Sequence, residues 1–390
     1  MKSMPPIPRG VWVLGFVSLL MDTSSEMIHS LLPLYLTVGL GASALVVGVI
    51  EGVAEATALI VKVFSGTLSD RLRNRKWITA AGYGLAAFTK PFFAMATGPM
   101  LVFVARFADR IGKGIRGAPR DALIADLTPK EIRGAAFGLR QALDTVGAFL
   151  GPLVAMVLML AWHDDFRAVF WVAVIPAIAS FALVATAVRE PESKASAASA
   201  PPSLDRATMR ALGHAFWGVT AAGAALTLAR FSEAFLILRA SDVGLEVAYA
   251  PLVLVVMNVV YSGAAYPSGR LADRMSARTL LIAGIAALIA ADVVLALAVN
   301  IGLVAAGVAL WGLHMALTQG LLSAMVARSA PAALRGTAFG VFNLVSGVAM
   351  LAASAAAGAL WQFVGPAATF WSGAALAAAS VVIVRWAARD

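Results

Sequence analysis

Apolar and polar positions alternate along this chain on the scale of whole helices rather than of single residues. A helix needs about twenty residues to cross the hydrocarbon core of a membrane, whereas a membrane-barrel strand needs about ten with alternating polarity. The pattern therefore predicts an all-α membrane protein with twelve transmembrane helices. The apolar stretches cover residues 11–36, 43–66, 77–97, 99–124, 134–160, 168–188, 211–238, 246–266, 279–298, 302–326, 337–360 and 366–386.

The composition agrees with this pattern. Hydrophobic residues make up 61% of the chain and charged residues only 13%, against about 25% charged in soluble proteins. There is no cysteine, which excludes disulfides and thiolate metal sites. The first apolar stretch follows Lys2 and Arg9 but contains Asp22 and Glu26 and lacks a small-residue cleavage site, so we interpret it as a retained span rather than a signal peptide.

The net charge of +9 would also fit a nucleic-acid-binding protein, but the placement of the charge argues against that class. Lys and Arg collect in every second connection between the apolar stretches. The connections near residues 38–43, 97–100, 299–302 and 361–366 carry none. By the positive-inside rule the basic connections and both termini are cytoplasmic, as in a multi-pass protein of the bacterial inner membrane.

Two sequence patterns occur twice, about half a chain apart. Gly-x-Leu-x-Asp-Arg begins at Gly66 and again at Gly269, and Arg-Gly-x-Ala-Phe-Gly begins at Arg133 and again at Arg335. Repeats that stay in phase indicate that a whole half was duplicated. We expect two pseudo-symmetric six-helix bundles, residues 1–189 and 209–390, joined by a flexible Pro-, Ser- and Ala-rich cytoplasmic linker at 190–208.

With twelve helices and this loop pattern after the second and eighth spans, the chain resembles the major facilitator superfamily over nearly its whole length. The resemblance implies alternating access, in which the two halves rock about a central site near the membrane midplane. It also implies that the repeated loop is a cytoplasmic gate that holds one conformation. The residues of this gating motif are Gly66, Asp70 and Arg71 in the first half and Gly269, Asp273 and Arg274 in the second.

Ionisable residues share one face of the first span. Asp22, Ser25, Glu26 and His29 follow helical spacing within otherwise apolar sequence. Ionisable groups inside a membrane are costly and usually mark a pathway, and carboxylates beside a histidine can exchange protons near neutral pH. We therefore predict that Asp22, Glu26 and His29 form a proton-coupling site. The alternative is that arginines neutralise both carboxylates permanently.

The fourth span is unusually charged for a transmembrane helix. It resembles the superfamily pattern in which an Arg precedes a Gln-Gly pair and further glycines. Arg106, Gly112 and Gly114 fit this pattern, while Asp109 and Arg110 stand where Gln and Gly are usual. The resemblance implies that Arg106 takes part in proton transfer.

Counting about 1.5 Å of rise per residue gives the height of each charge within its span. Three pairs from different spans come out level: Glu26 with Arg110, Lys113 with Asp144, and Arg116 with Arg140. Unpaired charges are costly in a membrane, so we expect some of these residues to form ion pairs. Arg116 and Arg140, alike in sign, are candidates to hold an anion.

Charges are sparse in the second half. Arg230 and Glu233 lie in the seventh span, Asp292 in the ninth and His314 in the tenth. Arg230 and Glu233 can satisfy each other or line the cavity, and we include both in the predicted substrate site. The full predicted substrate-binding set is Glu26, Arg110, Lys113, Arg116, Arg140, Asp144, Arg230 and Glu233.

The fifth span contains Gly147-Ala-Phe-Leu-Gly151-Pro152, which is similar to the core of a pattern found in exporters that exchange substrate for protons. Glycines of this kind also serve simple helix packing. The similarity favours export. We expect a proton-coupled antiporter that exports a small amphiphilic or anionic organic compound.

No pattern of an enzyme or nucleotide-binding loop is present in the sequence, so we expect no catalytic site and no cofactor beyond the proton gradient. The expected partners are a small-molecule substrate, protons and the lipid bilayer, with no nucleic acid and a monomeric state. Two alternatives remain open. In the first, the chain transports a divalent metal, with Asp22, Glu26 and His29 as its ligands, or a metal chelate. In the second, the chain is a non-transporting membrane sensor.

Overall fold

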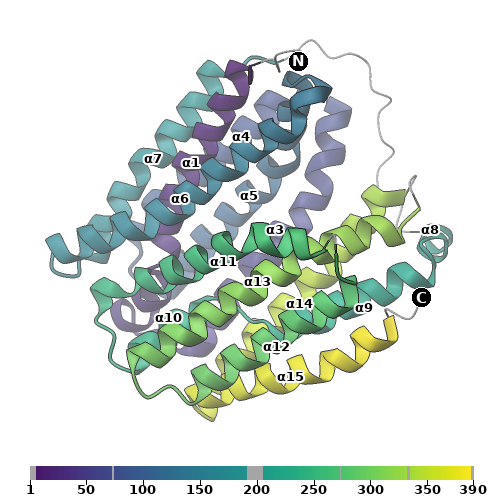
Figure 1. The fold of residues 1–390 in the computed structure, drawn as a ribbon. Helices are drawn as coiled ribbons and strands as arrows, with labels where there is room; N and C mark the ends of the chain where they lie inside the picture. Colours follow the sequence, from purple (N-terminus) through teal and green to yellow (C-terminus); the bar gives the residue numbers. More distant parts are fainter. Residues whose placement is uncertain (1–5, 73, 191–204, 273, 332–333, 388–390) are drawn as a thin grey trace. The chain divides into compact units, whose positions relative to one another are not determined.

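The chain is built of helices joined by short connections in the residues that its structure, a computed structural model, describes (Figure 1). These are residues 6–72, 74–190, 205–272, 274–331 and 334–387, with the backbone alone described at 66–68, 70–72, 130, 272 and 385–387. No strand occurs within these ranges, which confirms the all-α prediction. The longer helices are α1 (Arg9–His29), α3 (Ala44–Leu72), α4 (Arg75–Met95), α5 (Pro99–Leu127), α6 (Arg133–Ala161), α7 (Phe166–Ala187), α9 (Gly213–Ala229), α10 (Ala234–Asp242), α11 (Pro251–Ala272), α12 (Ala277–Ala296), α13 (Ile301–Ser329), α14 (Arg335–Phe363) and α15 (Pro366–Ala387).

Ten helical segments of the described residues are long and apolar enough to cross a membrane. The remaining two predicted spans correspond to α4 and α5, which have 21 and 29 residues. At about 1.5 Å per residue both are long enough to span the hydrocarbon core. Their mean hydropathy and charge content, rather than their length, set them apart from the other ten.

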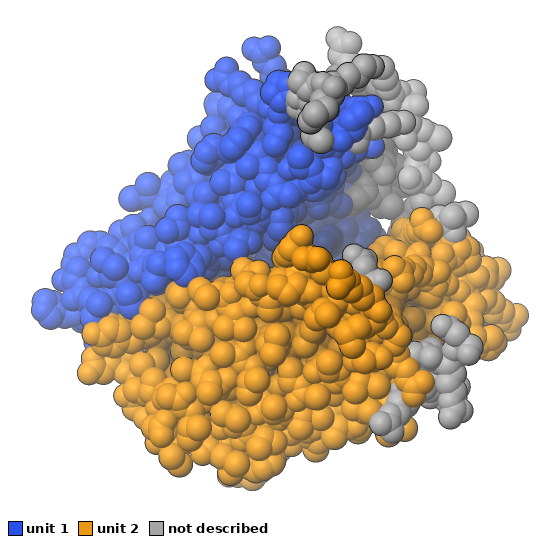
Figure 2. All heavy atoms as spheres, viewed as in Figure 1, with its two compact units in different colours: residues 1–31, 57–201 blue, residues 32–56, 202–390 orange. Residues whose placement is uncertain are grey.

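The helices form two compact units, which Figure 2 colours separately. Unit 1 contains residues 1–31 and 57–201, and unit 2 contains residues 32–56 and 202–390. The units therefore follow the two halves of the chain except for residues 32–56. Most of the linker predicted at 190–208 lies outside the described residues, which resume at residue 205.

The same packing pattern occurs in both units. In unit 1, α4 packs along α5, and α1 packs against both α6 and α7, while α4 also contacts α7. In unit 2, α12 packs along α13, and α9 packs against both α14 and α15, while α12 also contacts α15. Each half thus repeats one arrangement of helices, as the duplicated sequence patterns predict.

The first predicted span is interrupted after α1 ends at His29. Two short segments follow, the helical turn α2 (Leu32–Leu34) and the π-helical turn η1 (Tyr35–Gly39). Proline lacks a backbone N–H, and its ring clashes with the carbonyl four residues earlier. Pro33 stands four residues after His29, so it explains why α1 stops there.

The seventh predicted span is also broken, between α9 and α10. At the break, the backbone N–H of Ser232 donates to the Ser354 hydroxyl of α14 at 3.1 Å. The Ser232 hydroxyl in turn accepts a hydrogen bond from the Ala234 N–H at 3.2 Å. These bonds replace intrahelical ones, so contacts with α14 stabilise the break. The seventh predicted span, 211–238, corresponds to the segment Gly213–Asp242, which is long and apolar enough to cross a membrane, and the break lies within it.

Residues 44–56 of α3 belong to unit 2 because their backbone packs closely on α14. A Cβ atom added at Gly48 would lie 2.2 Å from the Ser354 carbonyl oxygen, and one added at Gly358 would lie 2.6 Å from the Ala44 carbonyl oxygen. Glycine is the residue that permits such close approach of two helices in a membrane. These contacts tie the first part of α3 to α14.

Candidate functional site

The acidic residues of α1 lie against the glycine face of α6 in unit 1. A Cβ atom added at Gly147 would come within 3.1 Å of the Asp22 Cβ. One added at Gly151 would lie 2.8 Å from the Glu26 Cβ and 2.6 Å from the Thr23 carbonyl oxygen. The exporter-like glycines therefore let α6 approach α1 at the level of the two carboxylates.

Gly151→Ala is expected to destabilise the protein by about 1–3 kcal/mol, because its methyl group would overlap the backbone of α1. Gly138→Ala, on the same helix, is the matched control, since nothing lies within 4 Å of its added Cβ atom. Alanine is the better helix former, so the control should be neutral or stabilising. Thermal unfolding of the purified variants measures both effects, and equal melting temperatures would contradict the close packing of α1 on α6.

Glu26 and His29 form a pair on α1. The His29 Nδ1 lies 3.3 Å from the Glu26 Oε2, and both side chains are mostly buried. Lys113 and Arg110 of α5 also act electrostatically on Glu26. The structure thus brings Glu26 near the two cations that the sequence places on the neighbouring charged helix.

Asp22, one turn earlier, has a different environment. The charged groups that act on it are Asp144 of α6 together with Arg116, Lys113 and Arg120 of α5. Asp22 therefore lies between a second carboxylate and a group of cations.

A buried ion pair connects α4 and α5. The Lys90 Nζ donates to the Asp109 Oδ1 at 2.9 Å and to the Ser25 hydroxyl of α1 at 3.0 Å. The two charged side chains are only 2% and 3% exposed. Since Ser25 precedes Glu26, this pair holds the acidic segment of α1 against α4 and α5.

The basic residues of α5 are largely buried. Arg106, Arg110 and Arg116 expose 1%, 2% and 4% of their surface. The Arg116 guanidinium lies over the Tyr83 ring, with 4.8 Å from Cζ to the ring centroid. Its Nη1 is buried and has no hydrogen-bond partner within the described residues. An unsatisfied buried guanidinium nitrogen is a ready donor for an anionic group.

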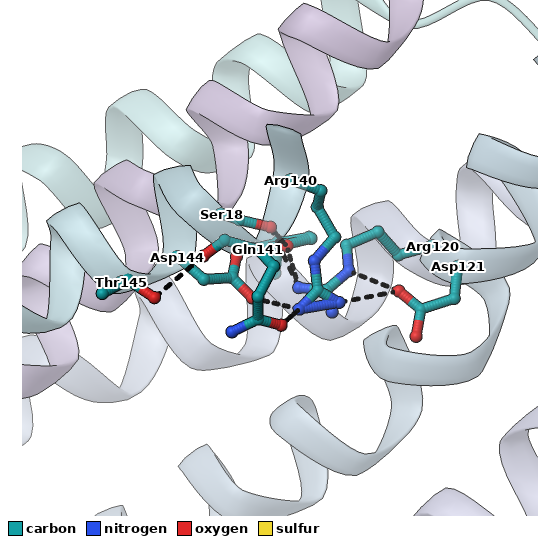
Figure 3. Close-up of polar contacts among 8 residues, drawn as sticks. Ser18, Arg120, Asp121, Arg140, Gln141, Asp144 and Thr145 are labelled. Atoms are coloured by element: carbon teal, nitrogen blue, oxygen red, sulfur yellow. Dashed lines mark hydrogen bonds and ion pairs between the residues drawn. The ribbon is translucent and has the colours of Figure 1, made fainter. Parts of the chain in front are cut away.

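A second polar cluster joins the carboxyl-terminal part of α5 to the amino-terminal part of α6 (Figure 3). Asp121 accepts hydrogen bonds from Arg120 and from Arg140, each at 3.2 Å. Arg140 also pairs with Asp144, and Arg120 donates to the Ser18 hydroxyl of α1 at 2.9 Å. Arg140 is therefore held by carboxylates, while Arg116 lies against Tyr83. The two arginines, level by height, have separate partners.

Arg230 and Glu233 belong to unit 2, where they border the break between α9 and α10. Asp292 and His314 lie in the same unit and are fully buried. The His314 Nδ1 lies 2.8 Å from the Gly284 carbonyl oxygen, and Arg230 acts electrostatically on the ring. The residues of the predicted substrate set are thus divided between the two units.

The structure describes part of the predicted gating motif. Asp273 and the side chains of Asp70 and Arg71 lie outside the described residues. Gly66 continues α3, and Gly269 lies in α11 with Arg274 after its end. Both Gly269 and Arg274 are exposed.

Sequence reasoning missed several polar partners. It did not include Lys90, Ser18 or Tyr83, which all contact charged residues of α5. The missed signal was Lys90 itself, a single cation inside an otherwise apolar span. It also missed Arg239, whose guanidinium donates to the carbonyl oxygens of Leu295 and Ala298 at 2.9 and 2.8 Å.

No group of three or more His, Cys, Asp or Glu side chains within the described residues is arranged to hold a metal ion. Asp22, Glu26 and His29 share a face of α1 but are not such a group.

Comparison with known proteins gives a consistent result. The sequence model of the Major Facilitator Superfamily matches residues 14–238 and 215–390. An uncharacterised MFS-type transporter of Methanocaldococcus jannaschii is 30% identical over 388 residues, which cover 97% of this chain and 94% of that protein. Multidrug resistance protein MdtH of Photorhabdus laumondii is 30% identical over 162 residues, covering 42% of this chain and 39% of that protein.

The fold itself is similar to that of solved transporters. A crystal structure of a mutant of the nucleoside transporter NupG matches with a TM-score of 0.77, covering 97% of this chain and 99% of that one. The sequence identity is 15%, so this likeness shows the fold alone.

Proposed function

Because the chain belongs to the Major Facilitator Superfamily, and is therefore a multi-pass membrane transporter rather than an enzyme, we propose that it is driven by protons. In this proposal it works by alternating access and exports a small amphiphilic or anionic organic compound across the bacterial inner membrane. It acts as a monomer with both termini in the cytoplasm. The repeated motifs, which begin at Gly66 near the end of α3 and at Gly269 near the end of α11, gate the cytoplasmic side.

The observation that carries this proposal is the meeting of acidic and basic helices in unit 1. Glu26 and Asp22 lie within the electrostatic reach of Lys113, and each also faces an arginine of α5. Protonation of either carboxylate removes a negative charge from this cluster and so changes how strongly its cations attract an anion. Proton binding and substrate binding are thereby coupled through shared partners.

The substrate class follows from the buried cations. Lys90 is matched by Asp109, whereas Arg116 keeps a buried nitrogen without a hydrogen-bond acceptor in the described residues. A carboxylate, sulfonate or phosphate on the substrate would satisfy that nitrogen. The Tyr83 ring beneath the guanidinium fixes its plane, which favours recognition of a planar anionic group.

Export is supported by two features. The glycines of α6 that resemble an exporter pattern pack directly against Asp22 and Glu26. The chain is also similar over part of its length to a protein named for multidrug resistance. One coupled proton moving across the field supplies about 2.3 kcal/mol per 100 mV, which is a useful driving force.

A second mode of coupling is favoured by the sign of the charges. An anionic substrate and an ionised carboxylate compete for the same cations, so protonated carboxylates would favour anion binding. In that case proton and substrate bind together, and the protein is a symporter. Export by exchange is instead expected for an amphiphilic substrate that also carries a cationic group, which pairs with the ionised Asp22 or Glu26 and competes with the proton. The direction of proton movement distinguishes the two modes.

The test is proton movement in proteoliposomes that contain the purified protein and a pH-sensitive dye. Salicylate and cholate are the anionic probes, and tetraphenylphosphonium is the cationic one. We expect an externally added substrate to move protons in the wild type. We expect the double variant Asp22→Asn, Glu26→Gln to lose that movement, because neither residue can then release a proton.

Asp164→Asn is the matched control. Asp164 is an exposed carboxylate at the turn between α6 and α7, where the backbone has φ +65°. Asparagine tolerates this conformation, so coupling should be unchanged. Unaltered proton movement in the double variant would refute the assignment of Asp22 and Glu26.

A further inference from the structure

The buried ion pair of unit 1 has a counterpart position in unit 2. Helices α4 and α5 begin at Arg75 and Pro99, and α12 and α13 begin 202 residues later at Ala277 and Ile301. The same offset relates Gly82, which packs on α5, to Gly284, which packs on α13. The two helix pairs are therefore equivalent residue by residue.

Under this equivalence, Lys90 corresponds to Asp292 and Asp109 corresponds to Trp311. The duplicated position has thus exchanged a cation for a carboxyl group. Its partner has changed from a carboxylate to an indole. Unit 2 keeps an ionisable group at this place but lacks the ion pair.

Asp292 is fully buried, and its surroundings leave it without a polar partner. Neither carboxyl oxygen has a hydrogen bond within the described residues. The carboxyl group is directed at Gly373 of α15, where an added Cβ atom would lie 2.6 Å from Oδ2. The space for this side chain exists because residue 373 is glycine.

Aromatic side chains surround the space between Asp292 and Gly373. Phe231, within the break between α9 and α10, has its Cε1 3.1 Å from the Cβ position of Gly373. Its ring centroid lies 5.4 Å from that of Trp311 and 5.5 Å from that of Phe370. The Trp311 Nε1 is also buried and has no hydrogen-bond partner in the described part of the chain.

No charged group of the described residues acts electrostatically on Asp292. The ring of His314 faces Gly284, two turns away from Asp292 on α12. The Arg239 guanidinium donates to the Leu295 carbonyl oxygen at the carboxyl-terminal end of α12. The titratable groups on the elements packed around α12 are Arg230 and Glu233 at the break, Arg239 and Asp242 on α10, Tyr261, Tyr266 and Arg270 on α11, and His314 and Arg328 on α13.

We propose that Asp292 is a proton-binding site of unit 2 and that its proton takes the place of the Lys90 ammonium group of unit 1. An ionised carboxylate without a partner is very costly inside an apolar core. A metal cation would require several further oxygen ligands, whereas a proton requires none. Asp292 is therefore a neutral carboxylic acid in this conformation.

The proton also stabilises the break between α9 and α10. Phe231 packs beside the carboxyl group, so a charge on Asp292 would draw water toward this aromatic cluster and loosen it. The site goes beyond the proposed transport mechanism and does not depend on it, because proton occupancy is measured without a substrate.

Infrared spectroscopy of the full-length protein near neutral pH tests the proposal. A protonated carboxyl group gives a C=O stretching band that a carboxylate lacks. We expect part of this band to disappear in Asp292→Asn and to remain in the control Asp164→Asn. An unchanged band in Asp292→Asn would overturn the proposal.

Thermal unfolding from neutral to alkaline pH gives an independent measurement. If the native state holds a proton that the unfolded chain releases, the free energy of unfolding falls as pH rises. We expect the melting temperature of the wild type to fall more steeply with pH than that of Asp292→Asn. Asp292→Leu, of similar size and apolar, should also fold. Failure of both variants to fold would show that the charge is needed and would overturn the proposal.

Discussion

Asp109→Asn is expected to destabilise the protein by about 3–5 kcal/mol, the cost of breaking a buried ion pair from one side. Asp109 is the only carboxylate among the buried residues of α5. Its removal would leave Lys90 buried beside Arg106, Arg110 and Arg116, all of which act electrostatically on the Asp109 site. Four cations would then share a low-dielectric region without that negative charge.

Lys90→Met should cost less than Asp109→Asn. Without the ammonium group, the Asp109 carboxylate still has the three arginines of α5 nearby. The double variant should be less destabilised than the sum of the two single variants, since neither partner is then left alone. Thermal unfolding of the purified protein in detergent gives this order, and a larger loss for Lys90→Met would contradict it.

The matched control is Asp126→Asn. Asp126 lies on α5 and pairs with Arg75 of α4, so it joins the same two helices as the buried pair. Its side chain is 40% exposed, and exposed pairs contribute about 0–1 kcal/mol. A loss as large as that of Asp109→Asn would show that burial does not set the strength of these pairs.

The positions of the helices could be predicted from the sequence because crossing a membrane requires long apolar segments, and the chain marks their ends with polar residues. The fourth predicted span, 99–124, corresponds to α5 at Pro99–Leu127. Even the most charged helix was recognised, since its length and its place between two connections left no other interpretation. The duplication was likewise visible before the packing was known.

The two interruptions show where local sequence information ends. The stop after His29 has a local cause in Pro33, which a reader of the sequence could have found. The break at 230–233 depends on Ser354, which is 122 residues away from Ser232 in the chain. No pattern within the seventh span reveals a hydrogen bond to another helix.

For the candidate site, the residue types were predictable but their partners were not. Helical rise gives the height of a charge and not the direction in which its side chain points. Asp144 was matched by height with Lys113, and in the structure it pairs with Arg140 on its own helix. Lys90 was overlooked because a lone cation in an apolar span has no pattern of its own.

Equivalent positions of the two units hold different ionisable residues. Unit 1 keeps Lys90 and Asp109 as a buried pair, while other cations of α5 act electrostatically on Asp22 and Glu26. In unit 2 the same positions hold Asp292 and Trp311, where the charge can be present or absent. The two units thus share one helix arrangement but differ in the charged residues that it holds.

Arg239→Met is expected to destabilise unit 2 by about 2–4 kcal/mol. The Arg239 Nε and Nη2 donate to the carbonyl oxygens of Leu295 and Ala298, which lie at the carboxyl-terminal end of α12. The Nη2 also donates to the Ala296 carbonyl oxygen at 3.4 Å. The Leu295 carbonyl keeps a second hydrogen bond, from the Ala298 N–H at 3.4 Å. The last carbonyls of a helix have no partner within it, so without the guanidinium the Ala296 and Ala298 carbonyls would be buried and unsatisfied, and each such group costs about 1–3 kcal/mol.

Arg239→Lys should give an intermediate loss, because lysine keeps the charge that favours the end of a helix but cannot reach several carbonyls with a planar fork. Asp242→Asn is the control for the ion pair, since Asp242 contacts the same guanidinium and is 37% exposed. It should cost less than about 1 kcal/mol. If Arg239→Lys melts like the wild type, charge alone stabilises this helix end, and the assigned role of the guanidinium hydrogen bonds is wrong.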